Sequence, residues 1–109
     1  GMICCTPSGS TAYNLSNGGP VLMWGLEAMA MTFVAPHSLR ARALVVPRGL
    51  TLGIANRSKE LPVTVLVDGH AVGELQRGEE LAVAVGPEHC RLAVLSEVTF
   101  FTRYHEVFP

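Results

Sequence analysis

The chain has 109 residues, of which 49% are hydrophobic and only 16% are charged, and its formal net charge is −1. This length supports one domain with one sizeable core, while a near-neutral chain does not attract a polyanion as a whole, so we expect no nucleic-acid partner. The low share of charged residues indicates that part of the surface is covered by another domain or by a neighbouring subunit.

The first elements along the chain are predicted to be a strand and a short helix. Residues 2–6 form a short apolar run, which is typical of a buried strand. The helix is expected to begin after a cap at Ser10 or Thr11. It should run to about Asn17 and end at Gly18, because glycine is favoured just beyond a helix C-terminus.

Residues 21–35 are almost wholly apolar, and two structures compete for them. The stretch LEAMAM has the propensity of a helix, whereas MAMTFVAP is equally typical of a buried strand. We favour a strand over residues 28–35. A second short strand is expected over residues 44–47.

From residue 50 the pattern becomes plainly β. Asp68-Gly69 is a hairpin turn signal. The spacing of roughly ten residues between strands favours a sandwich or a curled sheet. The tail at residues 99–108, TFFTRYHEVF, fits an amphipathic helix that packs on the sheet. Strands are predicted over residues 51–56, 63–69, 71–75, 81–85 and 91–96.

The three cysteines, Cys4, Cys5 and Cys90, form a poor disulfide framework because their number is odd and two are adjacent. Reduced thiols and a cytoplasmic protein are the better interpretation. Cys4 and Cys5 lie in an apolar run, and Cys90 is too isolated for zinc, so we expect no metal site. No stretch approaches the ~20 apolar residues of a membrane helix, so we expect no membrane partner.

The segment most suggestive of function is residues 6–20, TPSGSTAYNLSNGGP. Small residues after a strand let backbone N–H groups approach a ligand, and a helix N-terminus adds partial positive charge. Hydroxyls at Ser8, Ser10 and Thr11 favour a nucleotide or another phosphorylated or polyhydroxyl ligand, and Tyr13 offers a surface for stacking. From composition alone, a capped helix with a glycine-rich start is the commoner alternative. The segment matches neither a P-loop nor a hydrolase nucleophile elbow.

Other polar residues are weaker candidates. His37 could donate to a ligand, although a histidine bonded to a loop backbone is commoner. Asp68 is better explained as a turn residue than as a functional residue. Arg40 and Arg42 could face an anion or a partner surface, and a solvated loop is an equal alternative.

Two long segments, TPSGSTAYNLSNGGPVL and LEAMAMTFVAPHSLRARALVVP, resemble the C-terminal domain of the NAD kinase family. The later VTVLVDG, GEELAVAV and TFFTRYHEVF resemble the remaining segments of that domain in the same order. The resemblance implies a mainly β fold, with a two-sheet, β-sandwich-like arrangement, a short helix after the GSTAY loop and a C-terminal helix. It also implies a single domain over residues 1–109 and an N-terminal α/β domain outside this chain.

The resemblance also implies a reaction. NAD kinases transfer the terminal phosphate of ATP, or of inorganic polyphosphate in some members, to the 2′-hydroxyl of the adenosine ribose of NAD. The product is NADP. Family members are homodimers or homotetramers, and their NAD site lies where domains and subunits meet.

Carried over to this sequence, the resemblance implies an NAD site in the GSTAY segment. Ser8 and Thr11 would supply hydroxyls, and Ala12 would supply backbone polar groups. Tyr13 would pack against an aromatic ring of the dinucleotide, and Ser16, one turn later, would also reach the ligand.

More distant segments are implied at the same site. Ala35 and His37 would contribute to the pocket of a neighbouring subunit. Residues near Asp68-Gly69 would approach the new 2′-phosphate.

The catalytic motifs of the family have no counterpart here. Its GGDGT motif, which binds ATP phosphate and carries the proposed general base or metal-linked acid, is absent, as is its Asn-Glu or Asn-Asp pair. We therefore expect no catalytic residue in this chain, with phosphate and Mg²⁺ positioned by residues outside it. Phosphoryl transfer depends mainly on positioning and charge stabilisation, so the isolated chain should be inactive.

Other functions are alternatives to the interpretation that the chain is part of an NAD kinase. The chain could be a non-catalytic NAD(P)-binding module or truncated paralog, or an oligomerisation domain without a ligand site. A relative of the lipid kinases is a further alternative, against which the intact GSTAYNLS segment argues.

Overall fold

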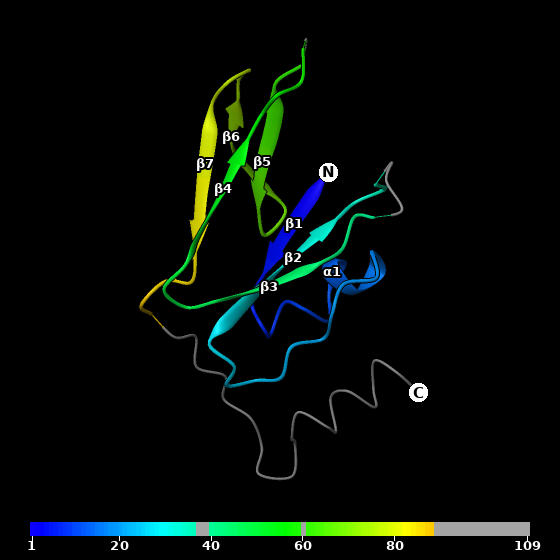
Figure 1. Ribbon diagram of the computed structural model, residues 1–109, viewed down its shortest axis with the longest axis vertical. Helices are drawn as coiled ribbons and strands as arrows, with labels where there is room; N and C mark the ends of the chain where they lie inside the picture. Colours follow the sequence, from blue (N-terminus) through cyan, green and yellow to red (C-terminus); the bar gives the residue numbers. More distant parts are fainter. Residues whose placement is uncertain (37–39, 60, 89–109) are drawn as a thin grey trace. The chain divides into compact units, whose positions relative to one another are not determined.

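The computed structural model describes residues 1–36, 40–59 and 61–88 (Figure 1). Within these ranges the chain forms two compact units, one from residues 1–50 and 85–88 and the other from residues 51–84. No helix among the described residues is long and apolar enough to cross a membrane. The elements are β1 (Met2–Cys5), α1 (Tyr13–Ser16), β2 (Ala28–Phe33), β3 (Leu44–Pro47), β4 (Thr51–Ala55), β5 (Val63–Val67), β6 (His70–Leu75) and β7 (Glu80–Ala84).

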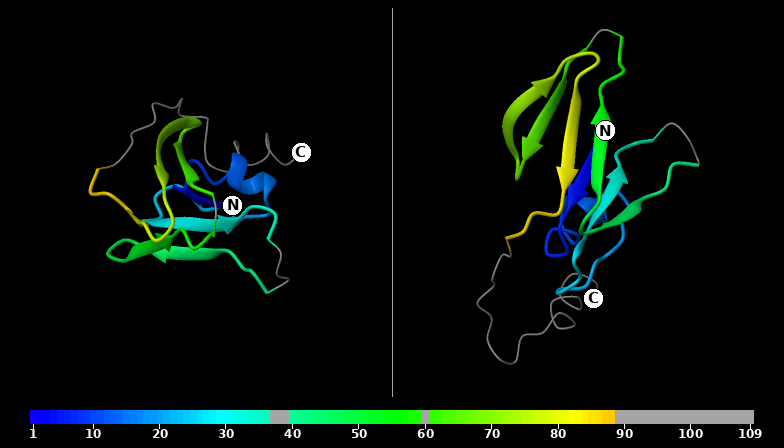
Figure 2. Two further views of the ribbon diagram at one scale, coloured as in Figure 1. Left: turned by 90° about the horizontal axis from the view of Figure 1, so that it is seen from above. Right: turned by 60° about the vertical axis from the view of Figure 1, so that its left-hand side comes forward.

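The first unit is built on a three-stranded antiparallel sheet in the order β1-β2-β3 (Figure 2). Cys4 pairs with Met31 on one side of β2, and Met29 pairs with Val46 on the other. Every residue from Ala28 to Thr32 is buried, so β2 is the central and innermost strand. This burial explains why LEAMAM does not form a helix, because pairing and packing on both sides outweigh a weak intrinsic propensity. The buried apolar residues are Leu22, Ala28, Met29, Ala30, Met31 and Val46.

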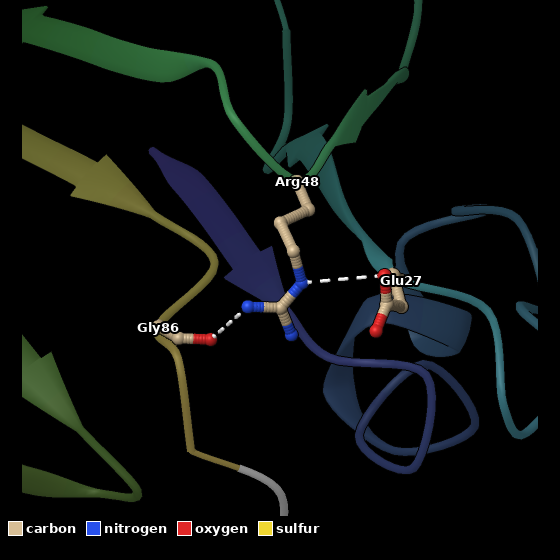
Figure 3. A network of polar contacts seen from close by, with 3 residues as sticks. All are labelled: Glu27, Arg48 and Gly86. Atoms are coloured by element: carbon tan, nitrogen blue, oxygen red, sulfur yellow. Dashed lines mark hydrogen bonds and ion pairs between the residues drawn. The ribbon is translucent and has the colours of Figure 1, made fainter.

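Arg48 connects three stretches of the first unit (Figure 3). Its backbone N–H donates to the carbonyl oxygen of Glu27 at 2.9 Å, which extends the β2–β3 ladder by one pair. Its side-chain Nη1 donates to the carbonyl oxygen of Gly86 at 2.6 Å, and its Nε lies 3.5 Å from Oε2 of Glu27. Arg48 therefore holds the chain that follows β7 beside the ends of β2 and β3.

The second unit consists of two antiparallel pairs, β4 with β7 and β5 with β6. Asp68 and Gly69 join β5 to β6 with φ angles of 49° and 82°. Two positive φ angles in a two-residue loop are the signature of a type I′ hairpin turn. Asn56, which is 5% exposed, donates from Nδ2 to the carbonyl oxygens of Leu75 and Leu61 at 2.7 and 3.2 Å. It thus fastens the chain after β4 to the end of β6.

The predicted mainly β fold is confirmed, and its strands lie close to the predicted ranges. The resemblance implied two sheets, and the hydrogen bonds of the described strands group them into three. The residue 28–35 strand ends at Phe33, and the Asp68-Gly69 hairpin forms as predicted. The strand expected over residues 91–96 and the helix expected over residues 99–108 lie outside the described residues, and the single-domain organisation stays a prediction.

Candidate functional site

Tight turns connect β1 to α1 across the segment singled out from the sequence. The N–H of Ser10 donates to the carbonyl oxygen of Pro7 at 3.2 Å, and that of Ala12 donates to Gly9 at 3.1 Å. The N–H of Gly9 donates to Oγ1 of Thr6 at 3.3 Å. The backbone donors of Gly9, Ser10 and Ala12 are therefore paired within the loop. The expectation that backbone N–H groups approach a ligand here is not met at Gly9, Ser10 or Ala12.

The predicted helix forms, but it is shorter than expected and begins later. It has four residues, and its N-cap is Ala12, with no side-chain hydrogen bond at the cap. The predicted cap at Ser10 or Thr11 is wrong because the turns at residues 7–12 delay the helix until Tyr13. One turn of helix aligns few peptide dipoles, so the helix N-terminus supplies no anion site. The helix ends at Ser16, one residue before the predicted Asn17, and Gly18 follows with a φ of 74°.

Ser10 is a structural residue. Its side chain is fully buried, and Oγ donates to the carbonyl oxygen of Pro7 at 2.7 Å. Oγ of Ser10 also accepts a hydrogen bond of 3.0 Å from the backbone N–H of Leu22. Ser10 therefore ties the start of the loop to the chain that leads into β2, and its hydroxyl does not face solvent.

Asn14 lies at the centre of a second set of buried hydrogen bonds. It is 1% exposed, and its Nδ2 donates to the carbonyl oxygens of Ser10 at 2.8 Å and Pro20 at 2.9 Å. Its Oδ1 accepts a hydrogen bond of 2.6 Å from Oγ1 of Thr32 in β2. Both amide hydrogens and the amide oxygen are thus paired, which satisfies a group that would otherwise be costly to bury.

Gly19 packs against this pair of side chains. A Cβ built on Gly19 would collide with Oδ1 of Asn14 and would lie 2.6 Å from Oγ1 of Thr32. A glycine is therefore needed at this second position of the GGP stretch, because the backbone lies very close to the side chains of Asn14 and Thr32. We call Ser10, Asn14, Gly19 and Thr32 the buried polar cluster.

The residues implied in dinucleotide binding lie on the other side of this loop. Tyr13 is 62% exposed. Ser8, Ala12 and Ser16 are exposed, and Thr11 is half-buried. Tyr13 and Ser16 are three residues apart in α1, so their side chains leave the same face of the helix.

Hydrogen bonds within the loop limit what Ala12 and Ser8 can offer to a ligand. Ala12 N–H donates to Gly9, and its carbonyl oxygen accepts the N–H of Leu15 at 3.0 Å, which leaves only a second lone pair of that oxygen for a ligand. Oγ of Ser8 lies 3.3 Å from Oγ1 of Thr6, so these two hydroxyls share a hydrogen bond at the surface.

The segment implied in a neighbouring pocket is described in part. Ala35 is exposed, lies just beyond β2 and has a φ of 47°. A left-handed backbone is uncommon for alanine, because its Cβ approaches the following carbonyl oxygen. His37 lies outside the described residues.

The titratable groups beside the loop are the thiols of β1. Burial raises the pKa of Cys4, and the neighbouring Cys5 raises it further. Burial also raises the pKa of Cys5, against the opposing effect of a hydrogen bond with the backbone of Ala30. Neither thiol is activated as a nucleophile or a metal ligand at neutral pH. Within residues 1–36, 40–59 and 61–88, no three His, Cys, Asp or Glu side chains gather in a way that could hold a metal ion.

Sequence reasoning missed most of the buried polar cluster. Asn14, Gly19 and Thr32 were not singled out, although they hold the loop in place. A signal was present, since Thr32 is the one hydroxyl in the strand AMAMTF and a lone polar side chain in a buried strand needs a partner.

Comparisons with known proteins point to one family. Residues 1–95 match the family model described as the ATP-NAD kinase C-terminal domain. The NAD kinase of Thermomicrobium roseum is 39% identical over 111 residues, covering 99% of this chain and 37% of the relative. That of Gemmatimonas aurantiaca is 39% identical over 103 residues, covering 94% and 36%. The chain thus spans little more than a third of these relatives.

A solved structure shows the same likeness in three dimensions. Yeast NADH kinase complexed with NADH matches with a TM-score of 0.66 at 34% sequence identity. The match covers 76% of this chain and 25% of the yeast chain. Sequence and fold therefore agree on one family.

Proposed function

Because this chain belongs to the NAD kinase family, we propose that it forms the NAD-binding part of an NAD kinase. The whole enzyme would transfer the terminal phosphate of ATP, or of inorganic polyphosphate, to the 2′-hydroxyl of the adenosine ribose of NAD and form NADP. Since the chain spans 37% of the Thermomicrobium relative, this reaction is proposed for the whole protein and binding for the chain itself.

The observation that carries the proposal is the exposure of Tyr13 on an anchored loop. A tyrosine side chain that is 62% exposed contributes little to the core of its own fold. Its neighbour Asn14 is buried and fully hydrogen-bonded, so the backbone that carries Tyr13 is fixed before any ligand arrives. An exposed aromatic ring on a fixed backbone suits stacking on a flat ring of a dinucleotide, because less backbone entropy remains to be lost on binding.

The polar contacts to the dinucleotide would come from side chains. The N–H groups of Gly9, Ser10 and Ala12 are already paired within the loop. We therefore assign ligand hydroxyl contacts to Ser8, Thr11 and Ser16, with Ala12 limited to its carbonyl oxygen. Hydroxyls both donate and accept, which suits the ribose hydroxyls and phosphate oxygens of NAD.

A second copy of the chain would complete the site. We propose a homodimer or homotetramer in which Ala35 and His37 line the pocket of a neighbouring subunit. The positive φ of Ala35 supports this role, because strained backbone is concentrated at binding and catalytic sites. NADH in the yeast relative supports a dinucleotide as the ligand.

Catalysis is not assigned to residues of this chain. No GGDGT motif occurs in it, so the groups that would position the phosphoryl donor belong to the rest of the enzyme. The described residues offer no group of ligands that fits Mg²⁺, and we derive no step through the ion. The isolated chain should bind NAD but not phosphorylate it. Free thiols at Cys4 and Cys5 agree with the cytoplasmic location that we propose.

Titration calorimetry tests the proposal by measuring the affinity of NAD for the intact protein and for its Tyr13→Ala variant. Loss of the stacked ring should weaken binding by about 1–3 kcal/mol. Leu61→Ala, at a side chain that is 73% exposed in the other unit, is the control and should bind as the unsubstituted protein does. NAD affinity that is unchanged by Tyr13→Ala would contradict the stacking role.

A second measurement tests catalysis. The intact protein should form NADP from NAD with ATP or polyphosphate, and the isolated 109-residue chain should not. Failure of the intact protein to form NADP, together with NAD binding, would favour a non-catalytic binding module.

A further inference from the structure

We infer that Asn14 and Thr32 are positioning residues for the dinucleotide, because the hydrogen bond between them fixes the orientation of α1 and so of Tyr13 and Ser16. This inference rests on the proposed function, since it concerns how the same segment binds NAD. It concerns residues that do not themselves face the ligand.

The helix cannot hold its own orientation. It has four residues and no side-chain cap, whereas isolated helices shorter than about 12–15 residues are marginal in water. Its geometry must therefore come from contacts with the rest of the unit.

Asn14 supplies those contacts in three directions. Its amide donates to Ser10 before the helix and to Pro20 after it, at 2.8 and 2.9 Å. Its Oδ1 accepts from Thr32 at 2.6 Å, which joins the helix to the central strand β2. The first two bonds lie within the loop itself, so the Thr32 bond is the one of the three that joins the helix to the sheet.

The directional hydrogen bond between Asn14 and Thr32 fixes the orientation of the exposed face of α1. An apolar contact would allow α1 to rotate or slide, whereas a hydrogen bond weakens steeply when its angle changes. Tyr13 directly precedes Asn14, and Ser16 follows two residues later, so any rotation that breaks the Thr32 bond also turns both exposed side chains. Small displacements of a binding group can cause large losses of affinity and rate.

Thr32→Val tests the inference in the intact protein, because valine has nearly the shape of threonine but no hydroxyl. NAD affinity measured by calorimetry should fall about tenfold, the effect of one buried hydrogen bond. Thr32→Ser keeps the hydroxyl and should restore affinity. The KM for the phosphoryl donor should not change in either variant.

Thr64→Val is the matched control, since it removes a hydroxyl from an exposed position of β5. It should leave NAD affinity unchanged. Circular dichroism at the titration temperature checks that each variant is folded. If Thr32→Val does not fold, Thr32→Ala removes the same hydroxyl without placing a methyl group beside Oδ1 of Asn14.

A double-mutant cycle separates positioning from general destabilisation. If Thr32 acts through Tyr13, then Thr32→Val should cost much less affinity in a Tyr13→Ala background. Unchanged NAD affinity in Thr32→Val, or losses that simply add in the double variant, would overturn the positioning role and leave the proposed function in place. Absence of NAD binding by the unsubstituted protein would overturn both.

Discussion

Gly19 shows how one residue without a side chain permits the buried polar cluster. A Cβ at this position would collide with Asn14 and lie 2.6 Å from Oγ1 of Thr32. Because both neighbours are buried and paired with each other, neither can move without losing a hydrogen bond. Gly19→Ala should therefore lower the free energy of unfolding by about 1–3 kcal/mol, as overpacking does in other cores.

Gly73 is the control for this change, measured by urea denaturation. It lies in β6, and a Cβ there would meet nothing within 4 Å. Gly73→Ala should leave stability unchanged or raise it slightly, by up to about 1 kcal/mol, because alanine restricts the unfolded chain. Equal midpoints for the two variants would show that the cluster tolerates a methyl group.

Cys4 and Cys5 make stability depend on alkaline pH. Burial raises the pKa of both thiols above the ordinary value of 9.0. The unfolded chain therefore releases these protons first as the pH rises, so the contribution of both thiols to stability is full below pH 9.0 and is lost as pH rises through their folded pKa values.

The expected result is a fall in the free energy of unfolding between pH 8 and about pH 10 that is smaller in the Cys4→Ala/Cys5→Ala double variant. The difference between the two proteins isolates the contribution of these two thiols from that of every other group. Identical pH profiles would mean that the thiols titrate alike in the folded and unfolded chains.

Among the elements, the β5–β6 hairpin has the clearest local determinant. Asp68 and Gly69 have φ angles of 49° and 82°, which a β-branched residue adopts only with strain. Gly69→Val should destabilise the protein by about 1–2 kcal/mol. Asp68→Asn should be nearly neutral, because asparagine also favours this turn. Thermal unfolding of both variants measures the difference, and a neutral Gly69→Val would argue against a type I′ turn.

The elements also show what sequence reasoning can reach. Strands such as β3 and the Asp68-Gly69 hairpin were predictable because their signals are local: a short apolar run, and a turn dipeptide with positive φ. The start of α1 was not, because the cap depends on turns at residues 7–12 whose hydrogen bonds compete with a helix. The role of Thr32 was also hidden, since its partner Asn14 lies 18 residues away in sequence.

At the scale of the whole chain, the sequence led to the family through long ordered segments rather than through composition. The GSTAY pattern pointed to a loop on which Thr11, Ala12 and Tyr13 are exposed or half-buried. It could not separate exposed residues from buried residues that hold the loop. Ser10 and Thr11 are adjacent and chemically alike, yet Ser10 is fully buried and Thr11 is half-buried. That distinction arises only when Leu22 and β2 pack against the loop.

Arg48 also acts at this scale, because it joins stretches around residues 27, 48 and 86 (Figure 3). Its two side-chain interactions are unequal. Glu27 is 58% exposed and lies 3.5 Å away, so this ion pair should contribute no more than about 0.5 kcal/mol. The 2.6 Å hydrogen bond to Gly86 is charge-assisted and anchors the chain after β7.

Arg48→Met should therefore lower the free energy of unfolding by about 1–2 kcal/mol, whereas Glu27→Gln should change it little. Methionine retains much of the apolar stem, so the comparison isolates the guanidinium group. Hydrogen exchange adds a local measurement: the amides of Val85, Gly86 and Glu88 should exchange faster in Arg48→Met than in Glu27→Gln, because only the first variant frees the carbonyl oxygen of Gly86. Equal losses of stability in the two variants would instead assign the anchoring to the ion pair with Glu27.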